Sequence, residues 1–131
     1  MNTILRGVDV KNENQAWIGV DLDGTLAIYN EWRGVHHIGA PIWPIVDRMK
    51  TLINTGITFK IFTARVCDPK RNYLVIPPIR NFLVSCGLPE DLEITNAKDF
   101  NCIEIWDNRA KQVGFNRGNF LEEDYYYRPG I

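Results

Sequence analysis

Residues 16–25 of the chain read AWIGVDLDGT, a short apolar run that leads directly into two aspartates, a glycine and a threonine. Residues 57–62 read ITFKIF and lead in the same way into Thr63. Both runs are short, rich in β-branched and aromatic residues and bounded by turn-forming residues, which is typical of buried strands. We therefore predict two strands, at residues 16–20 and 57–62, each followed by polar residues.

A helix is predicted between these two strands. Apolar residues recur at helical spacing over residues 42–53. Pro41 and Pro44 stand near the start, where proline is tolerated, and Gly56 follows the end, where glycine can cap a helix. Strand, helix and strand in this order predict a βαβ unit with parallel strands.

The rest of the chain is predicted to extend this unit into an α/β, Rossmann-like domain with a mainly parallel, five-stranded sheet. The further elements are one helix that ends at Gly87 and three strands, expected at residues 79–86, 92–95, 103–106 and 112–115. Only residues 96–102 connect the third strand to the fourth, whereas a parallel crossover usually needs a dozen or more residues. Either this connection is irregular or the third strand lies elsewhere.

Length and composition indicate a single domain that spans residues 1–131. The chain has 131 residues, 45% of them hydrophobic and 24% charged, and its 15 basic and 16 acidic residues give a net charge of −1. This length suits one compact domain. The charge balance lacks the basic excess that drives general binding to nucleic acids. Around the core we expect an N-terminal arm at residues 1–15, a flap at 28–40 and a C-terminal tail at 117–131.

The three cysteines, Cys67, Cys86 and Cys102, are an odd number and form no Cys-x-x-Cys pair. This pattern argues against a zinc knuckle and excludes a complete disulfide framework. We interpret them as buried, reduced thiols of a cytoplasmic protein. The first ten residues lack the apolar segment of a secretory signal, and no run of about 20 apolar residues is present, so we expect no membrane span.

Polar groups that can carry chemistry follow the predicted strands. In an open parallel sheet, ligands bind beyond the carboxyl ends of the strands. The groups expected there are Asp21, Asp23, Thr63, Lys98 and Asp107. Three carboxylates close together repel one another and are costly to bury. A divalent cation would remove this conflict, and carboxylate oxygens are the hard ligands that Mg²⁺ prefers, so the sequence predicts a magnesium site.

In order and spacing, these residues resemble the motifs of the haloacid dehalogenase (HAD) superfamily of phosphohydrolases. The Asp-x-Asp-Gly-Thr motif after a hydrophobic strand stands at residues 21–25, and the later Thr, Lys and acidic motifs match Thr63, Lys98 and Asp107. The match runs from residue 17 to about residue 113, and the residues around Thr63 resemble those of small capless hydrolases of bacteria and phages. The resemblance implies a three-layer, HAD-like domain without a cap domain.

The resemblance also implies a reaction, the Mg²⁺-dependent hydrolysis of a phosphomonoester. Asp21 would attack the phosphorus and form a phosphoaspartyl intermediate. Asp23 would act as the general acid and then as the general base. Asp21, the backbone carbonyl of Asp23, and Asp107 would hold Mg²⁺, which cancels charge and orients the attack.

Further residues would bind the phosphate. By the same resemblance, Gly24 and Thr25 would let the chain turn sharply and bring backbone N–H groups toward the phosphoryl oxygens. Thr63 would hydrogen-bond the phosphate. Lys98 would offset the negative charge on Asp21 and on the phosphoryl group.

Three residues have roles that the sequence leaves open. Asn108 follows Asp107 at a place where many relatives carry a second acid. Its amide can ligate the metal through oxygen or hold a metal-bound water, but it supplies no negative charge. Arg65 and Arg109 each follow a motif residue, and each either binds a substrate phosphate or carboxylate or pairs with a nearby acid.

The flap at residues 28–40 is too short to hold a cap domain, so we expect an open cleft. Tyr29, Trp32 and one histidine of the flap could stack on a base or a sugar, and packing of the flap onto the domain is the alternative. An open cleft suits a large substrate such as a polynucleotide end, or a site that a second copy screens in a homo-oligomer. Nucleotides and other phosphorylated small molecules also remain candidates.

Two alternatives belong to other functional classes. A receiver-like phosphoacceptor domain also uses strand-end acids, a threonine and a lysine. Its acidic pair and its acceptor lie on different strands, however, whereas Asp21 and Asp23 follow the same one. The other alternative is a non-catalytic domain that binds phosphate and Mg²⁺, for which Asn108 is the only hint.

Overall fold

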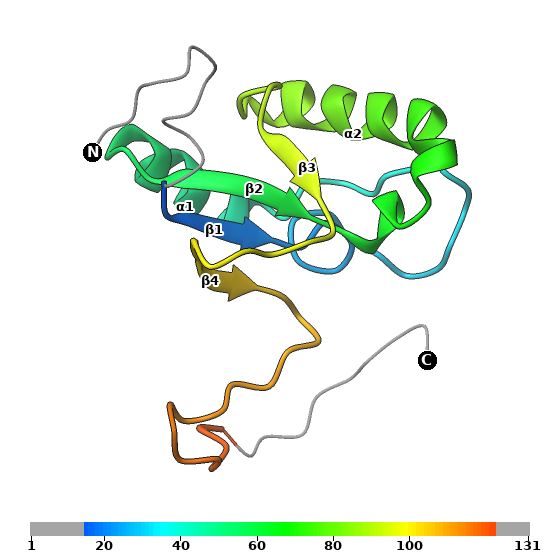
Figure 1. Ribbon diagram of the computed structural model, residues 1–131. Coiled ribbons are helices and arrows are strands. Elements are labelled where there is room, and N and C mark those ends of the chain that lie inside the picture. Colours follow the sequence, from blue (N-terminus) through cyan, green and yellow to red (C-terminus); the bar gives the residue numbers. More distant parts are fainter. Residues whose placement is uncertain (1–14, 123–131) are drawn as a thin grey trace, which may run out of the picture.

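The computed structural model describes residues 15–122 (Figure 1). Most of the expected arm at 1–15 and part of the expected tail at 117–131 lie outside the described residues. The helices and strands follow in the order β1 (Trp17–Val20), α1 (Trp43–Asn54), β2 (Thr58–Phe62), α2 (Asn72–Cys86), β3 (Glu93–Thr95) and β4 (Cys102–Trp106). Two short 3₁₀ helices lie between β2 and α2, namely η2 (Ala64–Val66) and η3 (Pro69–Arg71).

The four strands form one parallel sheet in the order β3-β2-β1-β4. β1 lies in the middle, where it pairs with β2 from Trp17↔Thr58 to Val20↔Ile61 and with β4 on its other side. The predicted α/β class, the βαβ unit and its parallel strands are confirmed. Because all strands run in the same direction, their carboxyl ends lie at one edge of the sheet.

The prediction of a fifth strand at residues 112–115 is wrong. In the described part of the chain this segment makes only an isolated antiparallel bridge, Val113↔Phe120, and does not join the sheet. Asn116 and Gly118 adopt positive φ angles of 59° and 81° and reverse the chain locally. The segment therefore pairs with its own continuation instead of with a neighbouring strand.

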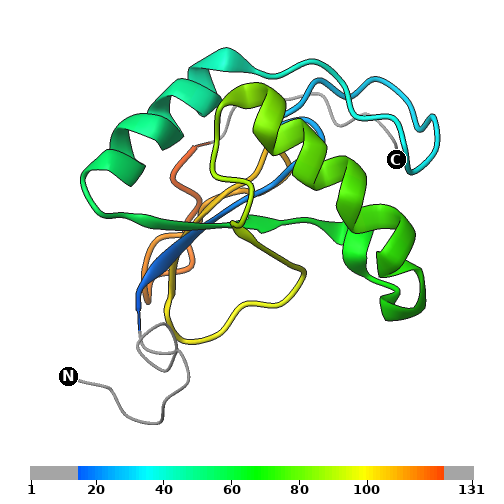
Figure 2. The ribbon, with the colours of Figure 1, turned by 90° about the horizontal axis from the view of Figure 1, so that it is seen from above.

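Both helices cover the same face of the sheet (Figure 2). Met49 of α1 and Leu83 of α2 pack in one hydrophobic core with Phe59 and Ile61, the two side chains that β2 points toward the helices. No helix covers the opposite face within residues 15–122. The described part thus has two layers, and the expected third layer is not seen there.

The connection from β3 to β4 explains the missing layer, because it contains no helix. Residues 96–101 cross the uncovered face as an irregular loop (Figure 2) and contact the start of β1. The backbone N–H of Trp17 donates to the carbonyl of Asn101 at 2.9 Å, and its indole N–H donates to Asp99 at 3.0 Å. The Lys60 ammonium lies 4.4 Å from the centre of the same indole ring. The third strand was therefore placed correctly, and the connection is irregular.

The helix ends follow the expected rules, apart from the start of α2. Gly56 follows α1 with a φ of 96°, and Gly87 caps α2 with a φ of 77°. The second helix begins at Asn72 rather than at residue 79, although Pro77 and Pro78 lie inside it and lack N–H groups for helical hydrogen bonds. Burial of the apolar side of α2 compensates for those lost bonds, which the sequence pattern alone does not reveal.

Two expectations about the environment of the protein can be compared with the structure. All three cysteines are free, as predicted, but only Cys86 is buried, whereas Cys67 is exposed and Cys102 is partly buried. Across residues 15–122 no helix combines the length and the apolar character that a membrane span requires.

Candidate active site

The carboxyl edge of the sheet borders a cavity of about 830 Å³. Each strand contributes the residue at or just past its end: Asp21 after β1, Thr63 after β2, Asn96 after β3 and Asp107 after β4. The remaining walls come from the 24–35 segment, from the turn after β4 and from the chain between β2 and α2. These walls are formed by Asp23, Gly24, Tyr29, Trp32, Val35, Phe62, Ala64, Arg65, Cys67, Asp68, Arg71, Val75, Asn108 and Arg109.

Asp21 lies where β1 and β4 end side by side. Its backbone N–H donates to the carbonyl of Trp106 at 2.9 Å, which brings the next residue of β4, Asp107, to the same end of the sheet. Partial burial, followed by the negative charges of Asp107 and Asp23, raises the pKa of Asp21 from 3.8 to about 7. The hydrogen bonds that lower this pKa, from Leu22 and Thr25, do not compensate. The site therefore holds excess negative charge around Asp21.

The turn after Asp21 is as sharp as predicted, but its N–H groups have partners inside the turn. Gly24 adopts a φ of 92°, and its N–H donates to the carbonyl of Ala27 at 2.8 Å. The N–H of Thr25 donates to the carbonyl of Leu22 at 3.4 Å. Contrary to the expectation from the resemblance, these two N–H groups are not directed at a phosphate.

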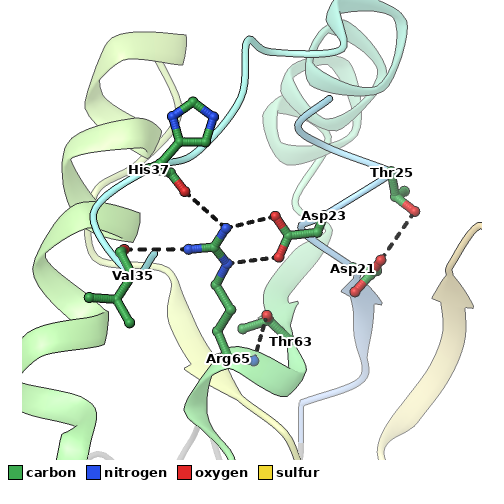
Figure 3. Close-up of polar contacts among 7 residues, drawn as sticks. All are labelled: Asp21, Asp23, Thr25, Val35, His37, Thr63 and Arg65. Carbon is green, nitrogen blue, oxygen red and sulfur yellow. Dashed lines mark hydrogen bonds and ion pairs between the residues drawn. The ribbon is translucent and has the colours of Figure 1, made fainter. Parts of the chain in front are cut away.

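Asp23 forms an ion pair with Arg65 (Figure 3). The sequence left open that Arg65 pairs with an acid, but it did not indicate which acid. The Arg65 Nε donates to one carboxylate oxygen at 2.7 Å, and Nη2 donates to the other at 2.9 Å. The side chains are only 7% exposed for Arg65 and 22% for Asp23, so solvent screens this pair weakly. Of the two roles left open for Arg65, the structure shows the pairing with an acid.

The same guanidinium holds the flap. Its Nη2 donates to the carbonyl of His37 at 3.0 Å and its Nη1 to the carbonyl of Val35 at 3.4 Å (Figure 3). Its carbon Cζ lies 4.9 Å from the centre of the Trp32 ring. Arg65 thus connects β2, the end of β1 and the flap through a single side chain. Packing of the flap onto the domain, one of the two expected possibilities, is therefore observed.

The base of the flap is closed by backbone contacts. The N–H of Ile28 donates to the carbonyl of Ala40 at 2.8 Å, and Ala27 pairs with Pro41 in an antiparallel bridge. Gly39 lies so close to the carbonyl of Ile28 that a side chain there would overlap it. The flap leaves and re-enters the domain at one place, which limits the directions in which it can move.

Thr63 is buried at the end of β2 and connects two neighbouring segments. Its backbone N–H donates to the carbonyl of Thr95 at 2.9 Å, and its hydroxyl oxygen accepts the N–H of Arg65 at 3.1 Å. The hydroxyl thereby caps η2, the turn that presents Arg65 to Asp23. Thr63 also lines the cavity, where its hydroxyl can donate a hydrogen bond to a ligand.

Asn108 serves to join the turn after β4 to the turn after β1. Its backbone N–H donates to the Thr25 hydroxyl at 3.0 Å, and its side-chain oxygen accepts from that hydroxyl at 3.1 Å. The Thr25 hydroxyl also lies 3.5 Å from Asp21, at the limit of a hydrogen bond (Figure 3). A side chain on Gly24 would meet the Asn108 amide at 2.9 Å, so glycine is required for this packing.

The two remaining cations proposed from sequence lie in different places. Arg109 lines the cavity, and its backbone N–H donates to Asp107 at 2.8 Å. Lys98 is exposed in the 96–101 loop and is not among the residues that line the cavity. The structure therefore brings Arg109 to the site and does not bring Lys98 there.

Some cavity residues carry no motif and were missed in the sequence. Asp68, Arg71 and Val75 line the cavity from η3 and the start of α2, and Asn96 follows β3. Residues at the end of a third strand could have been proposed from the rule that ligands bind at carboxyl ends. Residues at the start of α2 could not have been proposed for the cavity, because the predicted helix began only at residue 79.

The arrangement of acids bears on metal binding. Among the described residues, no three His, Cys, Asp or Glu side chains are grouped as metal ligands, and the Asp23 carboxylate is paired with Arg65. Two carboxylates with mutual repulsion remain, Asp21 and Asp107. Mg²⁺ is commonly held by one or two carboxylates, waters and a substrate phosphate, so this smaller donor set is chemically suited to it.

In comparisons with known proteins, no family model, no curated protein and no solved structure matches the chain.

Proposed function

We propose that the protein is a Mg²⁺-dependent phosphomonoesterase in which Asp21 is the nucleophile. Its carboxylate oxygen would form a bond to phosphorus while the bond from phosphorus to the substrate oxygen breaks. Asp23 would give a proton to that leaving oxygen. Water, deprotonated by Asp23, would then attack the phosphoaspartyl group, release inorganic phosphate and regenerate Asp21.

The observation that carries this proposal is the uncompensated charge around Asp21. Asp21 is partly buried beside Asp107 at the shared end of two parallel strands, and these surroundings raise its pKa to about 7. Clusters of this kind are costly for stability and are found where they serve a function. Asp21, Asp107 and the backbone carbonyl of Asp23 would hold Mg²⁺, whose charge would keep Asp21 ionised and offset that of the phosphoryl group.

Arg65 has a defined place in this scheme. It holds both oxygens of Asp23, so Asp23 can transfer a proton only after one of them is released. A phosphoryl group competes for the same guanidinium, since arginine binds phosphate and carboxylate with the same fork of donors. Substrate binding would therefore free the Asp23 carboxylate, which would take up a proton from solvent and pass it to the leaving oxygen. Thr63 would hydrogen-bond the phosphate, and the proposal does not depend on Lys98, which does not line the cavity in this structure.

We also propose a fold family, a cellular environment and an oligomeric state for the protein. A capless, HAD-like domain is the arrangement that best unites the acids after β1 and β4 with Thr63 after β2. The exposed, free Cys67 suits a reducing, cytoplasmic environment. A homo-oligomer that screens the cavity remains part of the proposal, as do phosphorylated small molecules and nucleic-acid ends as ligands.

One observation favours a second candidate, a phosphoacceptor without turnover. As long as Arg65 binds both oxygens of Asp23, this carboxylate is not free to deprotonate the water that would hydrolyse an acyl phosphate. In that case Asp21 would accept a phosphoryl group and retain it. The two candidates differ in the lifetime of the phosphoaspartyl group.

The test is hydrolysis of an aryl phosphate with and without Mg²⁺ by the unmodified chain, Asp21→Asn and Asp47→Asn. Asp47 is an exposed aspartate of α1 outside the cavity, so its substitution is a matched control. We expect Mg²⁺-dependent turnover that Asp21→Asn abolishes and Asp47→Asn retains. Stoichiometric phosphorylation of Asp21 without turnover would support the second candidate, and absence of both reactions would reject both.

A further inference from the structure

Trp32 presents an aromatic ring to the cavity although more than half of the residue is exposed. Its exposed fraction is 55%, and it lines the cavity together with Tyr29 and Val35 of the same flap. One side of the ring contacts the Arg65 guanidinium, 4.9 Å from the ring centre. Trp32, Tyr29 and Val35 together give this side of the cavity an aromatic and apolar wall that a flat ligand can cover.

The position of this ring is fixed by the residue that also holds Asp23. Arg65 makes hydrogen bonds to Asp23 and to the carbonyls of Val35 and His37, and its side chain is 7% exposed. A guanidinium with this many partners cannot turn freely, so the ring stacked against it is held in place. Only one guanidinium group separates the Trp32 ring from the Asp23 carboxylate.

A fixed aromatic surface at this distance from the acids suits a particular class of ligand. Flat heteroaromatic rings stack on tryptophan with a free energy of about 1–3 kcal/mol per base. A phosphate bound near Asp21 and a base joined to it through one pentose would span the two parts of the cavity. A sugar phosphate lacks the flat ring and would leave the apolar wall uncovered.

Resting on the phosphomonoesterase function, we propose that the substrate is a nucleoside monophosphate whose base stacks on Trp32. The phosphate lies at Asp21, and the base covers the side of the indole ring opposite Arg65. Tyr29 and Val35 complete the apolar wall next to the base.

The charges around the cavity favour a mononucleotide over a polynucleotide end. The lining residues include four aspartates and three arginines, and Arg65 is already neutralised by Asp23. Arg71 and Arg109 are the other two arginines. A polynucleotide needs cations along its backbone for binding, and the net charge of the chain is −1. The cavity can therefore accommodate one phosphate near a bound cation better than a row of phosphates.

The experiment compares adenosine 5′-monophosphate with ribose 5-phosphate, which lacks the base. The variants are Trp32→Leu, which keeps an apolar side chain but removes the aromatic face, and Trp43→Leu as the matched control. Trp43 is also an exposed tryptophan near a cation, 5.7 Å from Lys50, and it lies on α1 outside the cavity.

We expect the unmodified chain to have a kcat/KM at least about tenfold higher for the nucleotide than for the sugar phosphate, as stacking of about 1.4 kcal/mol implies. Trp32→Leu should bring this ratio close to one, and Trp43→Leu should leave it unchanged. The ratio cancels any general effect of Trp32 on Arg65, because both substrates share the phosphate. A ratio near one in the unmodified chain, or an unchanged ratio in Trp32→Leu, would overturn the inference.

Two further arms separate this inference from its alternatives. A short 5′-phosphorylated oligonucleotide hydrolysed with a higher kcat/KM than the mononucleotide would overturn the choice of a mononucleotide. If no substrate is hydrolysed, the proposed function fails, and calorimetric titration of adenosine 5′-monophosphate with Mg²⁺ then tests the inference alone. Binding that Trp32→Leu weakens about tenfold and Trp43→Leu does not would support the stacking site, whereas absence of binding would overturn it.

Discussion

The two aspartates that follow β1 lie two residues apart in the chain but in opposite electrostatic surroundings. Asp21 faces another acid, Asp107, and its pKa is raised to about 7. Asp23 faces Arg65, which binds both of its carboxylate oxygens within 2.9 Å. The side chains of Asp21 and Asp23 thus lie in different environments although both residues follow the same strand, just before the turn at Gly24.

This difference divides the cavity into two sides with distinct tasks. The Asp21 side has excess negative charge and is the side at which a cation and a phosphoryl group can be bound. The Asp23 side is balanced in charge and joins the flap to the sheet through Arg65. In such a site the Asp21 side would carry out the reaction, and the Asp23 side would hold Asp23 and the flap in position. Substitutions on the two sides should therefore have different effects.

The largest expected effect is that of Asp21→Asn. An amide cannot attack phosphorus, so kcat for an aryl phosphate should fall by at least about 10³-fold. In the absence of Mg²⁺ the same variant should be more stable than the unmodified chain at pH 8, because it removes a buried charge. Steady-state kinetics and thermal unfolding measure the two effects. Retained activity with an unchanged Tm would remove the proposed distinction between the two sides.

The next largest effect is expected for Arg65→Met on the balanced side. The substitution keeps a long side chain but leaves the partly buried Asp23 without its partner and releases the flap. We expect Tm to fall, since loss of one partner of a buried charge pair costs about 3 kcal/mol of stability, and kcat/KM to fall about 10²-fold, since Asp23 and the flap are no longer held in position. Arg65→Lys should restore only part of the lost kcat/KM, because an ammonium group cannot donate to both carboxylate oxygens of Asp23 with the planar, paired geometry of a guanidinium.

The control for Arg65 is Arg48→Met, which alters an exposed arginine of α1 outside the cavity. It should leave both kcat/KM and Tm within experimental error. Resistance of the flap to proteolysis adds an independent readout, and cleavage within residues 28–40 should be faster in Arg65→Met. Equal cleavage rates in both variants would show that Arg65 does not hold the flap.

A smaller effect is expected when the pH is changed without Mg²⁺, because the protonation of Asp21 then alters the stability of the unmodified chain. The pKa of Asp21 is about 7 in the folded chain, whereas the ordinary value for an aspartate is 3.8. The folded state thus binds the proton more tightly than the unfolded state, and stability should fall as the pH rises from about 4 to about 7. The full shift corresponds to about 4 kcal/mol, and partial exposure to solvent reduces it to about 2 kcal/mol.

Binding of Mg²⁺ at Asp21 should restore the stability that the chain loses as the pH rises. Protons and the cation compete for the same carboxylate, so the rise in Tm with Mg²⁺ should be large at pH 8 and small at pH 5. Differential scanning calorimetry at constant ionic strength measures it, and Asp21→Asn should abolish most of the pH 8 effect. A rise in Tm that is equal at both pH values would indicate general binding of the salt.

The smallest expected effect is that of Asn108→Asp, which adds a second acid after β4. The new carboxylate can keep the hydrogen bonds to Thr25, because both side chains offer an acceptor oxygen there. It brings a further negative charge toward Asp21, so the Mg²⁺ concentration at half-maximal activity should fall by about threefold. An unchanged or higher Mg²⁺ requirement would show that Asn108 lies too far from the cation to affect it.

Some parts of this fold were predictable because they depend on local patterns. The apolar runs before Asp21 and Thr63 identified β1 and β2, and glycines at positions 56 and 87 marked the ends of both helices. The fifth strand was predicted from the same patterns and the third layer from the family resemblance, and neither is seen in the described residues. Local reversal at Gly118 and the absence of a helix between β3 and β4 account for these differences.

The order of residues was enough to predict which chemical groups follow the strands, because strand periodicity and the parallel βαβ arrangement place Asp21, Thr63 and Asp107 at one edge. Only the tertiary structure decided how those groups are paired. Arg65 meets Asp23 across 42 positions of the chain and Trp32 across the flap, while Lys98 stays outside the cavity. Such contacts depend on the directions of side chains after long-range packing, and spacing along the chain carries no information about those directions.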